Sequence, residues 1–122
     1  MIRRAADRPL HVTIVELRRF TRDTKKLIGD EELQRLVVYL SENPKAGEVM
    51  EGTGGIRKLR WALAGAGKNG GARVIYYYHN DGMPLFLLAA YPKSAKIDVT
   101  AAEKKAMARL VKALVEQHKP TK

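Results

Sequence analysis

The chain has 122 residues and a formal net charge of +10, from 23 Lys and Arg against 13 Asp and Glu. It contains no cysteine, which excludes a disulfide scaffold, an iron–sulfur or thiolate zinc site and a cysteine nucleophile. No apolar run approaches the roughly 18–20 residues of a membrane span, and the N-terminal MIRRAADRPL lacks the apolar segment of a signal peptide. We expect one cytoplasmic domain over residues 1–122, with no membrane partner and with a polyanion as partner.

The first part of the chain predicts a strand followed by two helices. Residues 1–10 are expected to form a flexible tail, and the β-branched segment 11–17 (HVTIVEL) predicts a strand. A short helix is predicted over 20–28. A second helix is expected to begin with Asp30 as its N-cap and to stop at Asn43-Pro44. Four residues at helical spacing are expected to form its buried face: Leu33, Leu36, Val37 and Leu40.

Three strands are predicted in the middle of the chain, after a linker over 44–55. The first is the alternating segment 56–63 (IRKLRWAL), and the second is 72–79 (ARVIYYYH). The third, 85–91 (LFLLAAY), is apolar on both faces and is expected at the centre of a sheet. The turn NDG at 80–82 predicts a hairpin between the last two strands.

A final helix is predicted from Thr100, which forms a capping box with Glu103. Its inner face is expected to hold Met107, Leu110, Val111, Leu114 and His118. The order β-α-α-β-β-β-α predicts an α+β fold, in which two N-terminal helices and one C-terminal helix pack on a small, twisted, mostly antiparallel sheet.

The positive charge is concentrated in the second half of the chain. Residues 1–51 hold 10 basic and 9 acidic residues, whereas 52–99 hold 7 basic and 2 acidic residues. Between Gly52 and Asn80 no acidic residue occurs. A stretch without acids favours a surface that faces phosphates, although a solvated hairpin would show the same composition.

Two sequence features could suggest a dinucleotide site or a metal site, but the residues around them do not fit either kind of site. The string GAGKNG at 65–70 matches G-x-G-x-x-G, but a strand follows it instead of the helix that a dinucleotide site requires. The three histidines, His11, His79 and His118, have no acidic partner at metal-binding spacing. We therefore expect neither a nucleotide cofactor nor a metal.

Cations and phenols remain as the candidates for chemistry. Lys58 and Arg60 share the polar face of their strand, and Arg73 shares a face with Ile75 in the next. If these faces coincide with that of Tyr91 and Lys93, five polar side chains converge across three strands. Such a set suits phosphodiester chemistry, in which guanidinium groups stabilise the charged phosphorane and Lys or Tyr with a lowered pKa moves protons.

The sequence also allows purely structural roles for the tyrosines and for Arg73. Tyr76, Tyr77 and Tyr78 are expected mainly as core and rim aromatics with β propensity. For Arg73 the alternative is a structural salt bridge.

Two segments carry a family resemblance. GTGGIRKLRWALAGAGKNGGARVIYYY, followed by LFLLAAYPKSAK, closely resembles the RelE/HigB superfamily of type II toxins, specifically its HigB-like branch. The resemblance runs from about Leu33 to the final helix and implies a microbial-RNase-like fold. It implies a toxin that cleaves translated mRNA in the ribosomal A site without a metal. It also implies a helix-turn-helix antitoxin, through which alone the toxin would reach operator DNA.

The resemblance assigns roles to individual residues. Arg73 would bind the scissile phosphate, Lys93 would protonate the leaving oxygen or bind phosphate, and Tyr91 would orient or stack on a base. Lys58 and Arg60 match the basic positions of the first core strand. Three further cations are expected to bind RNA: Arg57, Lys68 and Lys96.

One position departs from the family pattern. A glycine is usual between that Tyr and Lys, and this chain has Pro92, which removes an N–H and can re-aim the strand end. Two alternatives therefore stand beside the nuclease: a non-catalytic basic module that binds RNA or the ribosome, and an inactivated toxin that acts only as an antitoxin-binding corepressor.

Overall fold

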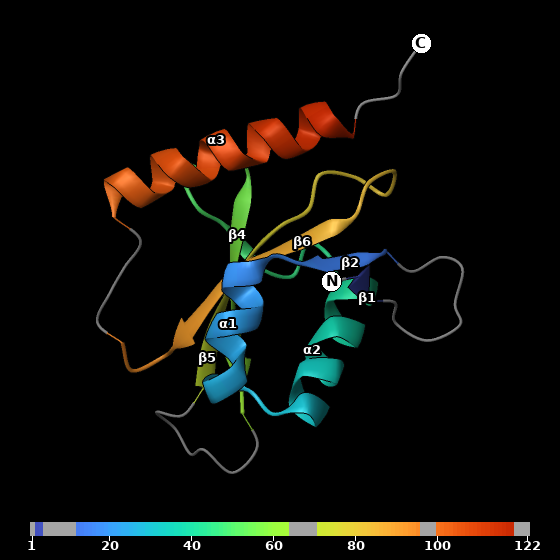
Figure 1. Cartoon of the computed structure of the whole chain (residues 1–122), viewed down its shortest axis with the longest axis vertical. Coiled ribbons are helices and arrows are strands. Elements are labelled where there is room, and N and C mark those ends of the chain that lie inside the picture. Colours follow the sequence, from blue (N-terminus) through green and yellow to red (C-terminus); the bar gives the residue numbers. More distant parts are fainter. Residues whose placement is uncertain (1, 4–11, 64–70, 96–99, 119–122) are drawn as a thin grey trace.

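A computed structural model describes residues 2–3, 12–63, 71–95 and 100–118. These residues form three helices and six strands (Figure 1). The strands are β1 (Ile2–Arg3), β2 (Ile14–Glu16), β3 (Glu48–Val49), β4 (Ile56–Ala62), β5 (Gly71–Tyr77) and β6 (Leu85–Pro92). The helices are α1 (Arg18–Leu27), α2 (Asp30–Glu42) and α3 (Ala101–Gln117). None of these three helices has the length and hydropathy needed to cross a membrane.

The strands form one sheet in the order β1-β2-β6-β5-β4-β3. β2 and β6 are parallel, and the other neighbouring pairs are antiparallel. β6 lies between β2 and β5, and its side chains enter the cores on both faces of the sheet, which explains its apolar sequence. The predicted α+β class, the mostly antiparallel sheet and the central position of this strand are confirmed.

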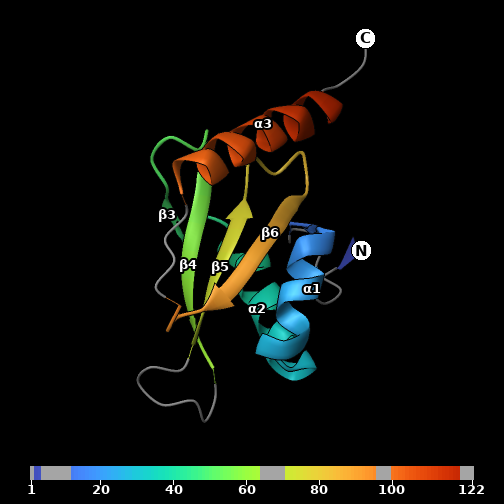
Figure 2. The same cartoon turned by 60° about the vertical axis from the view of Figure 1, so that its left-hand side comes forward.

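The helices cover the two faces of the sheet differently. α1 and α2 lie on one face, whereas α3 crosses the other face at one end of the strands (Figure 2). The core between the sheet and the pair α1 and α2 contains, among others, Phe20, Leu36, Leu40, Val74, Tyr76 and Leu87. The second core contains Ile56, Ile75, Tyr77, Phe86, Met107, Val111 and Leu114. The fold thus has a helix pair, a sheet and one further helix as its layers.

α2 begins one residue earlier than the sequence predicts. Gly29 is its N-cap, with φ −72° and ψ 162°, and Asp30 is the first helical residue, with no side-chain cap. The expectation that Asp30 caps the helix is therefore wrong. The carboxylates of Asp30, Glu31 and Glu32 instead occupy the first turn, where they interact favourably with the helix dipole. The predicted buried face of four residues is confirmed.

The predicted start of α3 is confirmed, whereas its predicted inner face is confirmed only in part. Thr100 and Glu103 form both hydrogen bonds of the capping box. Met107, Val111 and Leu114 are buried, but Leu110 is 38% exposed and does not belong to the inner face. The contact with a flat sheet is narrow, and residues spaced i, i+4 and i+7 fill it without Leu110.

Two short strands occur where none was predicted. Ile2 and Arg3 pair with Val15 and Ile14, so the prediction of a flexible tail is wrong at these two residues. Glu48 and Val49 form β3 within the predicted linker. Strands of two residues show no alternation that a sequence pattern could reveal, because backbone pairing alone defines them.

A buried phenol fixes the segment that leads into β3. The hydroxyl of Tyr76, a residue with no exposed surface, accepts the Gly47 N–H at 2.8 Å and donates to the Pro44 carbonyl at 2.9 Å. Burial also raises the pKa of this phenol. Tyr76 therefore ties the chain between α2 and β3 to the centre of the sheet.

We expect Tyr76→Phe to lower the free energy of unfolding by about 1–3 kcal/mol, because it leaves the buried Gly47 N–H and the partly buried Pro44 carbonyl without their partner. Urea denaturation followed by circular dichroism measures the loss. Tyr78→Phe is the control: its hydroxyl bonds to the exposed Asp81, and its removal should change stability by no more than about 0.5 kcal/mol. Equal losses in the two variants would contradict this assignment.

Candidate functional site

Three of the predicted site residues form a row across the sheet. Arg60 of β4 lies opposite Arg73 of β5, and Arg73 lies opposite Tyr91 of β6. Directly paired residues of neighbouring strands project from the same face of a sheet. Lys58 shares this face, because it precedes Arg60 by two positions. The faces that the sequence left open therefore coincide, and we call this group with Lys93 the cationic row.

A β-bulge in β6 brings Tyr91 to this face. Ile75 pairs with Ala89 and Tyr76 with Leu87, so Leu88 is an extra residue in β6. Before the bulge Leu87 faces the α1–α2 core, and after it Ala90 does. Odd-numbered residues of β6 therefore face the α1–α2 core before the bulge and the opposite face after it. As a result, Tyr91 projects from the same face as Arg73.

α3 covers only one end of the sheet face that bears the cationic row, and of that row Tyr91 packs against the α3 core. The helix packs over Ile75, Tyr77 and Phe86, which lie towards the end of the sheet where β5 enters the turn to β6 (Figure 2). Arg60 is exposed, and Arg73 is half-buried. The same face of the sheet therefore contributes a core at one end and an accessible group of cations at the other.

Arg73 is a guanidinium with unused hydrogen-bonding capacity. Its neighbours in the strand, Ala72 and Val74, are buried in the opposite core, and its Nε is buried without an acceptor among the described residues. No carboxylate in the described part of the chain forms an ion pair with it. The structural salt bridge that was the alternative for Arg73 does not occur within these residues.

The pairing of Arg60 with Arg73 is electrostatically unfavourable in the absence of an anion. Like charges directly opposite each other on neighbouring strands destabilise a sheet. An anion held between the two guanidinium groups removes the repulsion and supplies the acceptors that Arg73 lacks. This arrangement can accept a phosphate or a similar oxyanion.

Lys93 remains in register in spite of Pro92. The Lys93 N–H donates to the Gly71 carbonyl at 2.9 Å, so the β5–β6 ladder continues beyond the proline. Pro92 lies opposite Ala72, between hydrogen-bonded pairs, where a strand residue directs its N–H away from its partner. The missing N–H therefore interrupts nothing, and the strand end is not re-aimed.

The lysine stem lies over the same face as Arg73. The Cδ of Lys93 is 3.8 Å from the point that a Cβ on Gly71 would occupy. Gly71 and Arg73 are two positions apart in β5, so both belong to one face. The structure thus brings together all five polar residues that the sequence placed on three strands.

Three tyrosines next to this group have structural positions. Burial raises the pKa of Tyr76 and of Tyr77, and the hydrogen bond to Asp81 raises the pKa of Tyr78. The Tyr77 hydroxyl is 2.9 Å from Nδ1 of His79. Tyr76 and Tyr77 are buried and Tyr78 is partly buried against the α1–α2 core, so the expectation that they are core and rim aromatics is confirmed.

The cations assigned to RNA binding are not all at the row. Arg57 projects from the opposite face, since its partner Tyr76 belongs to the α1–α2 core, and it donates to the Gly47 and Lys45 carbonyls at 2.8 and 3.2 Å. Lys68 and Lys96 lie outside the described residues. Arg57 therefore stabilises the segment before β3, and its assignment to RNA is not supported by its position.

Residues 1–51 are nearly neutral as a whole, but one helix within them, α1, is strongly basic. α1 carries five basic side chains and one acidic side chain, and α2 carries one basic and four acidic side chains, so the two helices differ in the sign of their charge. A hollow of about 720 Å³ beside α1 is lined by Glu16, Arg18, Arg19, Thr21, Arg22 and Lys25. The sequence run RRFTRDTKK carried this signal, which the average over residues 1–51 cancelled.

Within the residues that the structure describes, no group of three or more His, Asp or Glu side chains is arranged to hold a metal. His79 is bonded to Tyr77, and the ring of His118 packs edge-on against Phe86, with 5.5 Å between the centroids.

Comparison with protein families identifies the class of protein. The model for the RelE toxin of the RelE/RelB toxin–antitoxin system matches residues 12–121. The chain therefore belongs to the RelE toxin family. It is the toxin of a toxin–antitoxin system, and this membership implies an antitoxin as partner.

The opposed arginines lead to a stability prediction. We expect Arg60→Gln to raise the free energy of unfolding by about 0.2–1 kcal/mol at low salt, because it removes the repulsion from Arg73. The gain should vanish in about 1 M salt, where the screening length is about 3 Å. Urea denaturation at both salt concentrations measures it. Arg109→Gln, an equal charge change on exposed α3, should give no comparable gain.

Proposed function

We propose that this chain is a metal-independent endoribonuclease that cleaves translated mRNA in the ribosomal A site and so inhibits translation in the cytoplasm. The opposed pair of Arg60 and Arg73 carries the proposal, because it forms an oxyanion site on an accessible strand face. Family membership supports the class of activity, since RelE toxins are generally endoribonucleases. The ribosomal A site and the HigB-like branch follow from the sequence resemblance.

RNA supplies the nucleophile for this reaction. Its 2′-hydroxyl attacks the adjacent phosphorus, which forms a 2′,3′-cyclic phosphate and breaks the bond to the 5′-oxygen of the next nucleotide. The 2′-hydroxyl gives its proton to a base such as a water molecule, and the departing 5′-oxygen takes a proton from an acid. The protein must therefore stabilise a phosphorane and deliver a proton, which cations can do without a protein nucleophile.

Each member of the cationic row has a role in this scheme. Arg73 binds the scissile phosphate, with Arg60 and Lys58 adding positive charge from β4. Lys93, whose stem runs past Gly71 on the same face, protonates the leaving oxygen. Tyr91 pairs with Arg73 in the register and orients or stacks on a base. Guanidinium groups suit the phosphorane because they present several donors in a rigid plane.

The remaining partners follow from the same proposal. The cations of α1 add a second surface that can contact ribosomal RNA phosphates. A helix-turn-helix antitoxin neutralises the toxin and connects it indirectly to operator DNA.

We expect Arg73→Ala to lower the rate of mRNA cleavage by about 100- to 1000-fold, because it removes the donors for the developing phosphorane charge. Mapping mRNA ends by primer extension after induction, with wild type beside the variant, measures the loss. Lys45→Ala removes an exposed cation away from the row and should leave cleavage unchanged. Growth arrest with intact mRNA would contradict the nuclease and indicate steric inhibition instead, and absence of arrest would indicate a corepressor.

Pro92→Gly tests whether the departure from the family pattern matters. We expect the cleavage rate to stay within about threefold of wild type, because the position makes no ladder bond that proline could remove. Stability should fall by about 0.4–1 kcal/mol, since glycine gives the unfolded chain more freedom. A large gain in cleavage on this substitution would show that the proline does disturb Lys93.

A further inference from the structure

Part of β4 forms a free edge of the sheet. β3 pairs with β4 only opposite Arg57 and Lys58, and no described strand lies on that side of Leu59–Ala62. The Gly71–Lys93 hydrogen bond fixes which residues face this edge, because bonding alternates along an antiparallel strand.

The alternation points the main chain of two residues outward. Ala72 directs its N–H and C=O to β4, where its partner is Trp61. The residues on either side of Trp61, namely Arg60 and Ala62, therefore direct their N–H and C=O away from β5. These groups are a template on which an extended segment of another chain can form hydrogen bonds.

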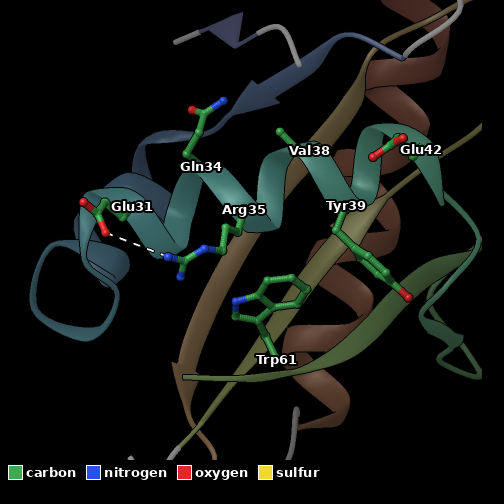
Figure 3. Close-up of a pocket in the computed structure, with 7 residues that line it drawn as sticks. All are labelled: Glu31, Gln34, Arg35, Val38, Tyr39, Glu42 and Trp61. Atoms are coloured by element: carbon green, nitrogen blue, oxygen red, sulfur yellow. Dashed lines mark ion pairs between the residues drawn. The ribbon is translucent and has the colours of Figure 1, made fainter. Parts of the chain in front are cut away.

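An aromatic groove lies beside the free edge. It lies between α2 and β4 and has a volume of about 560 Å³. Trp61 and Tyr39 dominate it, with ring centroids 5.4 Å apart, and Tyr39 is 39% exposed (Figure 3). The Nε1 of Trp61 is buried without an acceptor among the described residues. The groove thus offers apolar and aromatic contact.

The charges around the edge indicate the composition of the occupant. Arg35 at the rim is neutralised by Glu31 and Glu32, at 3.8 and 2.8 Å (Figure 3 draws the first pair). Arg60 projects from the other face, exposed and with no ion pair among the described residues. A strand paired with β4 would place an acidic side chain opposite Arg60 and the next side chain, an apolar one, in the groove. A second copy of this chain, with its charge of +10, would bring cations instead.

We propose that the antitoxin adds an extended strand of alternating acidic and apolar residues to β4 at Arg60–Ala62. Its apolar side chain packs on Trp61 and Tyr39, and its carboxylate pairs with Arg60. The carboxylate then occupies the anion site of the cationic row, which explains how docking at an edge would also block RNA. This inference rests on the proposed function in one respect only, namely that RNA is the ligand which docking would exclude.

Hydrogen exchange and two matched proline variants test this edge. In the complex with the purified antitoxin, the Arg60 and Ala62 amides should gain protection, and the emission of Trp61, the only tryptophan in the chain, should shift. Ala62→Pro removes an outward N–H and should weaken antitoxin binding at least tenfold. Val49→Pro removes the equivalent group from β3, since Met50 bonds to Ile56 and Val49 therefore faces outward, and should weaken binding less than twofold.

Arg60→Glu provides a second variant whose sheet pairing is retained, and it should also weaken antitoxin binding at least tenfold. Unchanged exchange at Arg60 and Ala62 in a formed complex would overturn the proposal, as would equal effects of Ala62→Pro and Val49→Pro. Binding is measured directly, so loss of RNA cleavage alone would count against the proposed nuclease and not against this docking edge. Conversely, docking elsewhere would leave the nuclease proposal intact.

Discussion

The register of β4, β5 and β6 is the constraint on which the site depends. Main-chain hydrogen bonds hold Arg60, Arg73 and Tyr91 opposite one another, although they are far apart in the sequence. A slip of one residue would turn the side chains of a strand to the other face. The apolar cores on both faces resist such a slip, because it would expose residues such as Val74 and Ile75 that are fully buried. Packing at both faces therefore fixes the position of the cations.

Because of the bulge and of α3, one end of a single sheet face forms a core and the other end carries the cationic row. The bulge at Leu88 lets Phe86 contribute to the α3 core while Tyr91 joins the cationic row. α3 then buries one end of that face and leaves the other accessible (Figure 2). We expect the opposed arginines to weaken the sheet slightly in the free protein and the cores on either side to offset that cost.

Charge is distributed by helix and by face, which relates the surface proposed to bind RNA to the edge proposed to bind the antitoxin. The cationic row and α1 are basic, whereas α2 begins with three acidic residues and borders the Trp61–Tyr39 groove. Arg60 connects the two surfaces, because its side chain belongs to the row and its main chain to the free edge. One residue can therefore contribute to phosphate binding and to its inhibition.

The sequence by itself determined the elements whose periodicity extends over several residues: α2, α3, the three long strands and the polar side of β4. It also identified Arg73, Lys93 and their companions as candidates, because cations and phenols are the main chemical groups on the three predicted strands and the turn at 80–82 holds the one acidic residue between 52 and 97. It could not show the two-residue strands, the outward position of Leu110 or the different face of Arg57. Only the tertiary structure decided that the polar faces coincide and that the β5–β6 ladder continues past Pro92 to Lys93, because both depend on strand register and on a bulge within LFLLAAY, where uniform apolarity carries no signal of which side chain faces which layer.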